Sequence, residues 1–302
     1  MKAIVTGGAG FIGSTLVDSL IDKGYEVVIL DDLSTGNMDN VNSKATFVEC
    51  DISKTVEYDG IDYAATNHFE GADVVFHTAA LARVQPSILN PIKYNDVNVN
   101  GTLNLLVQCV KHKIKKFVFS SSSSVYGNPK ILPTPETHSL NPMSPYALHK
   151  QIGEQYCKLF SDLHDISTVS LRYFNVYGDR QPTSGAYCLV MGIFAQQMKS
   201  GQKLTINGDG EQRRDFTYVK DVVAANIAAS KLDCKNEIFN IGAGNNKSVN
   251  HIAQLFGGDT VHNDPVIEPN ETLADNGKAK ELLGFKPFDD FDGWCKNWIK
   301  KM

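Results

Sequence analysis

The sequence predicts an α/β fold in which helices cover both faces of a doubly wound parallel sheet. Short apolar runs rich in Val, Ile and Phe alternate with longer amphipathic stretches along the first part of the chain. The runs, which are the predicted strands, are Ala3–Val5, Val27–Leu30, Val74–His77, Phe117–Ser120 and Thr168–Leu171. Because parallel strands need crossover connections long enough to hold a helix, this alternation predicts a parallel sheet.

Helical patterns fill the stretches between these runs. The predicted helices cover 14–23, 98–113, about 146–163 and 220–231, and a further one covers the tail from 291 to 300. In that tail Trp294 and Trp298 stand four residues apart, which indicates a packed helical face.

The regular alternation of apolar runs and amphipathic stretches ends after Tyr173. Segments rich in Gly, Pro and Asn then dominate, which indicates loops and a second, smaller unit. We expect a first domain over residues 1–172, to which 217–236 return. A smaller C-terminal α/β lobe is expected over 173–216 and 237–302.

Composition narrows the class of protein. The chain has 302 residues, 42% of them hydrophobic and 21% charged, which is ordinary for a packed globular protein. A net charge of −5 gives no support for a nucleic-acid or anionic-membrane partner. The start MKAIVTGGAGFIG leads directly into strand-like sequence and no apolar run reaches membrane-spanning length, so we expect a cytoplasmic protein. Its 6 cysteines form no CxxC pair, so neither a metal site nor a disulfide framework is expected.

A glycine-rich turn follows the first predicted strand. Gly7–Gly13 has the pattern GxxGxxG, and the predicted helix begins at once. Glycine permits close approach of the backbone to a pyrophosphate, and a helix N-terminus offers unpaired N–H groups. Asp31 ends the next strand, where a carboxylate can bind both adenosine ribose hydroxyls and repels a 2′-phosphate. We therefore predict a Rossmann-like dinucleotide site that favours NAD over NADP.

A candidate acid–base set lies further along the chain. Tyr146 and Lys150 are one helical turn apart and share a face. The run Ser120–Ser124 ends a predicted parallel strand, where open α/β sheets bind ligands. Hydride removal from a carbinol carbon needs a base for the hydroxyl proton, and tyrosine with a pKa of about 10 is a poor one. We expect the lysine ammonium and the positive nicotinamide to lower the pKa of Tyr146, with a serine relaying the proton.

These residues resemble a known family, the extended short-chain dehydrogenases, and within it the UDP-glucose and UDP-N-acetylglucosamine 4-epimerases. The resemblance covers essentially the whole chain. Its segments are TGGAGFIG at 6–13, DDLSTG at 31–36, CDI at 50–52, HTAAL at 77–81, NVNGT at 98–102, SSSSVYG at 121–127, SPYALHK at 144–150, RYFNVYG at 172–178 and GDGEQRRDF at 208–216.

The resemblance implies roles for individual residues. Tyr146 resembles the catalytic base, Lys150 its electrostatic partner and nicotinamide-ribose ligand, and Ser122 the proton relay. The implied cofactor residues are Gly7, Gly10, Phe11, Ile12, Gly13, Asp31, Asp32, Ser34, Thr35, Gly36, Asp51, Ile52, Thr78, Ala79, Ala80, Asn98, Tyr146, Lys150 and Tyr173. The implied substrate residues are Arg83, Ser122, Ser124, Tyr146, Asn175, Val190, Thr205, Asn207, Arg214 and Thr272.

The chain departs from the family at one position. Relatives usually have an arginine shortly before the ADxxKA segment that pairs with the substrate diphosphate, and this chain has none after Arg214. Such a loss weakens diphosphate binding unless another cation substitutes. Arg83 follows the HTAAL segment and is a candidate, with a solvated surface arginine as the alternative interpretation.

The reaction is inferred from residues 122–124. The resemblance implies acidic residues there in 4,6-dehydratases and in decarboxylases, whereas this chain has three serines. C4 epimerisation of a UDP-sugar is the simplest remaining outcome, with UDP-glucose, UDP-N-acetylglucosamine and UDP-glucuronate left open. The resemblance places Thr272 at the family's gate position, where a small residue leaves room for an N-acetyl group. The alternatives are an NAD-dependent nucleotide-sugar oxidoreductase that releases NADH, and a non-catalytic NAD-binding protein.

The resemblance also implies an assembly. Relatives dimerise through two helices of each subunit, which correspond here to 98–113 and 146–163. We therefore expect a homodimer.

Overall fold

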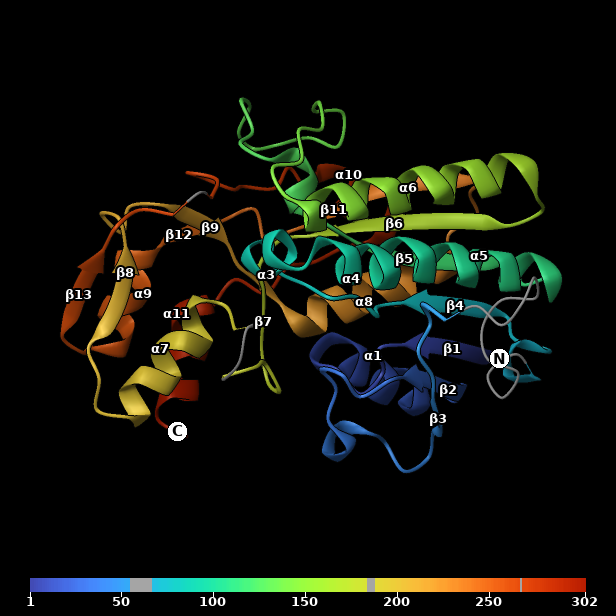
Figure 1. Ribbon diagram of the computed structural model, residues 1–302, viewed down its shortest axis with the longest axis horizontal. Helices are drawn as coiled ribbons and strands as arrows, with labels where there is room; N and C mark the ends of the chain where they lie inside the picture. Colours follow the sequence, from blue (N-terminus) through green and yellow to red (C-terminus); the bar gives the residue numbers. More distant parts are fainter. Residues whose placement is uncertain (55–66, 184–187, 267) are drawn as a thin grey trace.

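The computed structural model describes residues 1–54, 67–183, 188–266 and 268–302. Its centre is a seven-stranded sheet in which every neighbouring pair is parallel (Figure 1). In spatial order the strands are β11 Asn236–Ile241, β6 Ser167–Tyr173, β5 Lys116–Ser122, β4 Val74–His77, β1 Lys2–Thr6, β2 Glu26–Asp31 and β3 Thr46–Glu49. The predicted parallel sheet is confirmed.

Strand order reverses at β1. From β1 the chain moves to β2 and β3 on one side, then returns to β4 and continues through β5 and β6 on the other. Such a reversal leaves a crevice at the carboxyl ends of the strands, where open α/β sheets bind ligands.

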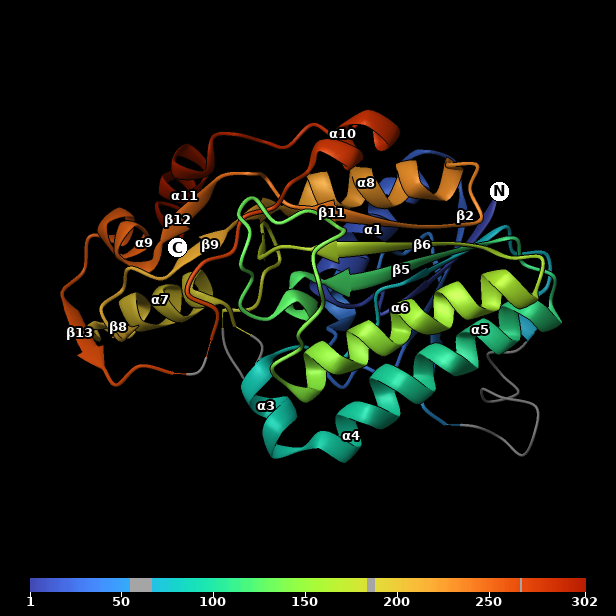
Figure 2. The ribbon, with the colours of Figure 1, turned by 90° about the horizontal axis from the view of Figure 1, so that it is seen from above.

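Both faces of the sheet are covered, so its central strands are buried on both sides. Helices α1 Phe11–Asp22, α8 Val219–Lys231 and α10 Gly277–Leu283 contribute apolar side chains to the core on one face. Helices α5 Gly101–Lys111 and α6 Pro145–Leu163 contribute to the core on the other. Figure 2 shows α8 on one side of β5 and β6, with α5 and α6 on the opposite side. This two-sided burial explains the continuous apolar runs in the sequence.

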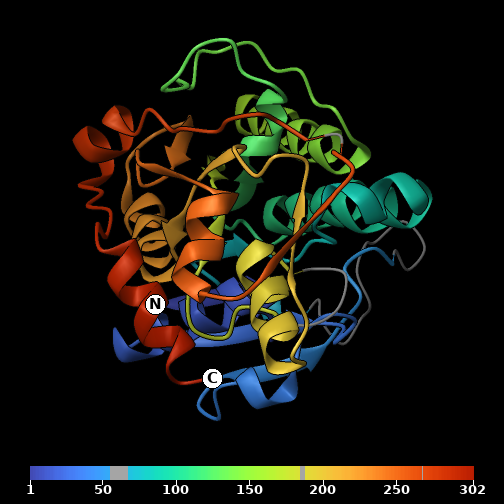
Figure 3. The same cartoon turned by 90° about the vertical axis from the view of Figure 1, so that its left-hand side faces the viewer.

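A smaller lobe packs beyond the carboxyl ends of the strands (Figure 1). Its helices are α7 Val190–Lys199, α9 Val249–Phe256 and α11 Phe291–Ile299, and its strands are β8 Leu204–Asn207, β9 Arg213–Asp215, β12 Asn246–Ser248 and β13 Thr260–Asn263. Figure 3 views this lobe directly and shows the three helices in yellow, orange and red. Trp294 and Trp298 stack with ring centroids 5.6 Å apart and pack against the core of the lobe, so the predicted packed face is confirmed.

The predicted boundary at residues 236 and 237 is wrong because it cuts through β11. Asn236–Ile241 pairs with β6 along its whole length, so this strand belongs to the main sheet. Shorter elements complete the fold: α3 Val84–Leu89, α4 Pro91–Asn95, β7 Val176–Tyr177 and β10 Thr217–Tyr218. No helix in the described ranges combines the length and apolarity needed to cross a membrane.

Candidate active site

A cavity of about 870 Å³ lies along the carboxyl ends of the central strands. Residues of the glycine turn line one end, and residues of α7, β8 and β9 line the other. The cavity therefore has walls from both the sheet and the smaller lobe, and it holds the predicted catalytic residues Tyr146 and Ser122 between them.

The glycine turn fits a dinucleotide pyrophosphate. Gly7 has φ = 70°, and a Cβ added there would stand 2.7 Å from the backbone N of Ala79. A Cβ at Gly13 would stand 2.1 Å from the carbonyl oxygen of Gly7. Helix α1 begins after Gly10 without a side-chain cap, so its first N–H groups stay available to an anion. The turn thus needs glycine for its own packing and leaves a cradle for phosphate.

The Asp31 carboxylate lies beside this cradle. Its Oδ2 accepts a hydrogen bond of 2.9 Å from Ala9 N, and its Oδ1 accepts one of 2.9 Å from Leu33 N. Burial raises the pKa of Asp31, and these two backbone hydrogen bonds oppose that shift. Each oxygen keeps lone-pair capacity for a ribose hydroxyl. The residues present therefore fit NAD.

The predicted cofactor residues line the cavity with three exceptions, Gly36, Asn98 and Lys150. Asn98 does not line the cavity but supports the lining residue Leu81. Its Nδ2 donates to Leu81 O and its Oδ1 accepts from Leu81 N, both at 2.9 Å. It lies in a π-helical turn, Asp96–Asn100, of the kind often found at functional sites. Asn98 thus holds the segment after β4 in place.

Tyr146 and Lys150 are positioned by the start of α6. Ser144 precedes the helix and its Oγ accepts a hydrogen bond from Ala147 N, as an N-cap residue does. Lys150 Nζ lies 5.9 Å from the centroid of the Tyr146 ring and donates to Ser120 O at 2.7 Å. Ser122, at the end of β5, hydrogen-bonds with Tyr146 and accepts from Ser124 Oγ at 2.9 Å. The structure therefore brings the three predicted catalytic side chains together.

The protein groups alone do not produce the expected lowering of the pKa of Tyr146. Burial raises the pKa of Tyr146, and the hydrogen bond with Ser122 only partly opposes this. Burial also lowers the pKa of Lys150 to about 8. The ammonium points at the Ser120 carbonyl rather than at the phenol oxygen, and the positive nicotinamide on which the expectation also relied belongs to the cofactor.

A buried ion pair lies one helical turn beyond Lys150. Arg172 and Glu154 have side chains only 3% and 4% exposed, with Nη2 and Oε2 2.7 Å apart. Glu154 Oε1 also accepts from Arg172 Nε at 2.8 Å and from Ser121 Oγ at 2.5 Å. Arg172 Nη1 donates to Tyr126 OH at 2.7 Å. The network ties α6 to the end of β5 next to Ser122, and sequence patterns did not reveal it.

The predicted substrate residues all line the cavity. Thr272 is buried, and its hydroxyl accepts a hydrogen bond of 3.3 Å from Asp215 N. Asn175 Nδ2 donates to Asp215 O at 3.3 Å. Asp215 in turn accepts from the backbone of Ala243 and Ala274, which fastens distant loops around this end of the cavity.

Glu268 and Gln212 are cavity residues that the sequence did not suggest. Glu268 Oε2 lies 2.7 Å from Arg214 Nη2, and Gln212 Nε2 donates to Glu268 Oε1 at 3.3 Å. Arg83 Nη1 is buried without a hydrogen-bond partner in the described structure. Glu268 is a single carboxylate in a Pro- and Asn-rich segment and belongs to no periodic pattern, so only the fold reveals its position beside Arg214.

The fold and the site define a class, the dinucleotide-dependent enzymes built on a doubly wound sheet. The sequence profile of the NAD dependent epimerase/dehydratase family matches residues 3–242. The chain belongs to this family.

Proteins with assigned names match the chain along nearly its whole length. A protein of Methanocaldococcus jannaschii that carries a provisional UDP-glucose 4-epimerase name is 44% identical, and the match covers 98% of both chains. A UDP-glucose 4-epimerase of Thermotoga maritima, solved with UDP-glucose, superposes with a TM-score of 0.93 at 38% identity, covering 99% and 98% of the two chains. A UDP-N-acetylglucosamine 4-epimerase of Methanobrevibacter ruminantium, solved with UDP-N-acetylmuramic acid, gives 0.91 at 36% identity, covering 99% and 97%.

Proposed function

We propose that this protein is a UDP-sugar 4-epimerase that uses NAD to invert C4 reversibly. The observation that carries the proposal is that Tyr146 and Ser122 line a cavity that fits NAD at one end, with Lys150 one helical turn from Tyr146. Residues 122–124 are three serines, so no carboxylate stands there to drive elimination or decarboxylation. The names of the full-length relatives support the same reaction.

The side chains suit proton transfer at the sugar C4 hydroxyl. Bound NAD would supply a hydride acceptor, and it would return the hydride to the other face of the 4-keto sugar after that sugar has rotated. Tyr146 takes the hydroxyl proton, and Ser122 bridges the hydroxyl and the phenol. Lys150 would bind the cofactor ribose, and its positive charge favours the phenolate form of Tyr146. Ser124 donates to Ser122, which fixes the direction of the relay.

The remaining cavity residues hold the nucleotide end of the substrate. Asn175, Arg214 and Arg83 are the proposed diphosphate ligands, because charge-assisted hydrogen bonds to phosphate are strong and directional. Val190, Thr205 and Asn207 line the same end. Thr272 is small, so the sugar subsite has room for an N-acetyl group, and UDP-glucose and UDP-N-acetylglucosamine are both proposed substrates. UDP-glucuronate is the alternative substrate.

The test is turnover of UDP-sugars by purified protein, with products separated by chromatography. We expect interconversion of UDP-glucose with UDP-galactose, of the two N-acetyl sugars, or of both, with no net NADH absorbance. Tyr146→Phe should abolish turnover and leave NAD bound. Accumulating NADH would favour an oxidoreductase. Near-normal turnover by Tyr146→Phe would refute the assignment of Tyr146 as the catalytic base. Bound NAD without any turnover would favour the binding protein.

We also propose an assembly, a domain division and a location. Helices α5 and α6 expose apolar side chains, Val107, Leu148, Leu159 and Leu163, which suit a homodimer built on these helices. The proposed dinucleotide domain covers 1–172 and 217–241, with α10 packed against it, and the remaining residues form the substrate lobe. Light scattering of the protein in solution tests the dimer. Cytoplasmic location is part of the same proposal and is tested by cell fractionation.

A further inference from the structure

Opposite charges meet at the nucleotide end of the cavity. Arg83 and Arg214 are the basic side chains among the described lining residues, which include no lysine or histidine. Glu268 is the acidic side chain at this end, and the other lining carboxylates, Asp31, Asp32 and Asp51, lie at or just after the ends of β2 and β3 near the glycine turn. The three side chains together carry one net positive charge.

The contact between Glu268 and Arg214 is close but poorly aligned. Oε2 and Nη2 are 2.7 Å apart, while Nη2 is buried and makes no hydrogen bond within the described structure. Arg214 Nη1 donates instead to Arg213 O at 2.9 Å. The Glu268 side chain keeps 36% of its surface exposed, against 11% for Arg214. Because the carboxylate is about one-third exposed and poorly aligned with Nη2, this ion pair is weaker than a buried bidentate pair and can be exchanged for another anion.

A nucleoside diphosphate carries more negative charge than this site can balance while Glu268 stays in place. Each phosphate brings at least one negative charge, which matches Arg83 and Arg214 one to one. With Glu268 on Arg214, one of those charges would face a carboxylate instead of a free guanidinium, and like charges in close contact repel. Arg214 can pair fully with only one of the two anions.

We infer that Glu268 is an internal counter-ion that the substrate diphosphate displaces from Arg214. The inference rests on the proposed function, since it concerns how a UDP-sugar enters the same cavity. In the free protein Glu268 holds the guanidinium beside the cavity. On binding, Arg214 exchanges this carboxylate for phosphate, so Glu268 weakens the binding of every UDP-sugar by the same factor and leaves the sugar end unaffected.

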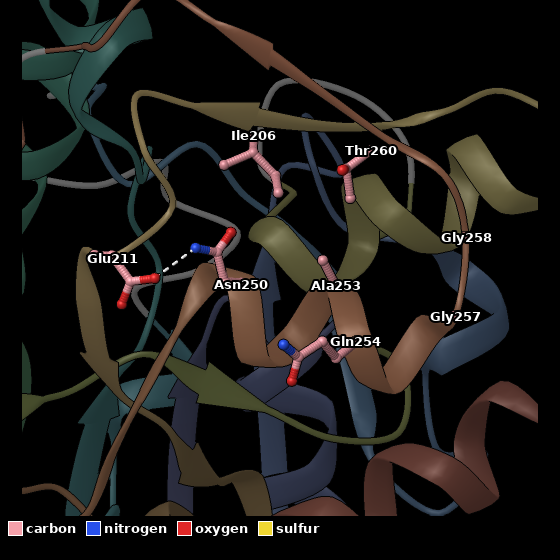
Figure 4. A pocket seen from close by; sticks show the side chains of 8 residues that line it. All are labelled: Ile206, Glu211, Asn250, Ala253, Gln254, Gly257, Gly258 and Thr260. Atoms are coloured by element: carbon pink, nitrogen blue, oxygen red, sulfur yellow. Dashed lines mark hydrogen bonds between the residues drawn. The ribbon is translucent and has the colours of Figure 1, made fainter.

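The test compares Glu268→Gln with a matched control, by calorimetry with UDP and with uridine. Glutamine keeps the shape and removes the charge. Glu211→Gln removes one charge from the same lobe but not from this cavity. Glu211 Oε1 accepts a hydrogen bond of 2.6 Å from Asn250 Nδ2 in a separate hollow of about 440 Å³ (Figure 4). We expect E268Q to bind UDP about three- to fivefold more tightly than the wild type, with uridine binding and E211Q unchanged.

Each other outcome overturns the exchange. Equal or weaker binding of UDP by E268Q would show that Glu268 does not compete, and the same gain in E211Q would show an effect of net charge alone. A gain with uridine would place the effect away from phosphate. If the wild type converts UDP-sugars but one of these contrary binding results is found, the proposed function stands and only the exchange is refuted. If the wild type does not bind UDP, both fail.

Discussion

The buried pair of Glu154 and Arg172 allows a quantitative prediction. Glu154→Gln keeps the shape of the side chain but leaves the Arg172 guanidinium, 3% exposed, without a counter-charge. Removing one partner of such a pair costs about 3–5 kcal/mol of unfolding free energy. For a chain of this size that lowers Tm by roughly 5–8 °C. The same helix provides a control, Asp162→Asn, because Asp162 pairs with Lys158 in solvent and should change stability little.

The same variant should also change the pH profile of turnover. Burial lowers the pKa of Lys150 to about 8, and the negative charge of Glu154 is among the groups that raise it. Without that charge the pKa of Lys150 falls further, so the ammonium that assists Tyr146 is lost at a lower pH. The alkaline limb of kcat/KM should therefore move to lower pH, which loss of stability alone does not produce.

Urea unfolding followed by circular dichroism, with turnover measured from pH 6 to about pH 10, tests both expectations. The reasoning is refuted if Glu154→Gln unfolds within about 0.5 kcal/mol of the wild type, the usual range for surface changes. An unchanged alkaline limb in a folded variant would refute the electrostatic part.

Two further predictions concern charged residues of the site. Arg83→Ala removes a buried guanidinium whose Nη1 has no protein hydrogen-bond partner, so KM for UDP-sugars should rise about tenfold or more with NAD occupancy unchanged; an unchanged KM would mean that Arg83 does not bind the diphosphate. Lys150 has a pKa lowered from 10.5 to about 8, so folding favours its neutral form, and stability rises as pH increases from about 8 to 10.5. Lys150→Met should lack this rise and be more stable than the wild type below pH 8, by on the order of 3 kcal/mol. The test is the unfolding free energy of both proteins, measured with urea at several pH values, and the same pH dependence in both would contradict the prediction.

Sequence patterns were most informative where local structure carries the signal. The turn at Gly7–Gly13 needs glycine for backbone geometry and close packing, so its pattern is visible in the sequence and in the structure alike. The strands of the main sheet are buried on both faces, which makes them continuous apolar runs. β11, NEIFNI, is an edge strand with polar residues among apolar ones, and the predicted boundary fell inside it.

Features that depend on distant contacts could not be predicted in this way. Glu268 reaches Arg214 across more than fifty residues of chain, and nothing local distinguishes it from a solvated glutamate. The pKa of Tyr146 depends on burial by surrounding elements, which spacing on a helix does not reveal. The match of Tyr146 and Lys150 to one helical face was readable, whereas the direction of the lysine towards Ser120 was not.

The edge position of β11 has a consequence for how the chain folds during synthesis. β6 ends at Tyr173, but its partner strand β11 begins only at Asn236, after α7, β8, β9 and α8 have been made. Until then the β6 edge presents unpaired backbone groups, which are open to pairing with other chains. A truncated protein ending near residue 172 would keep the glycine turn and the catalytic residues but expose that edge. For expression of the dinucleotide half alone, the strand 236–241 should be supplied as well, for example by circular permutation.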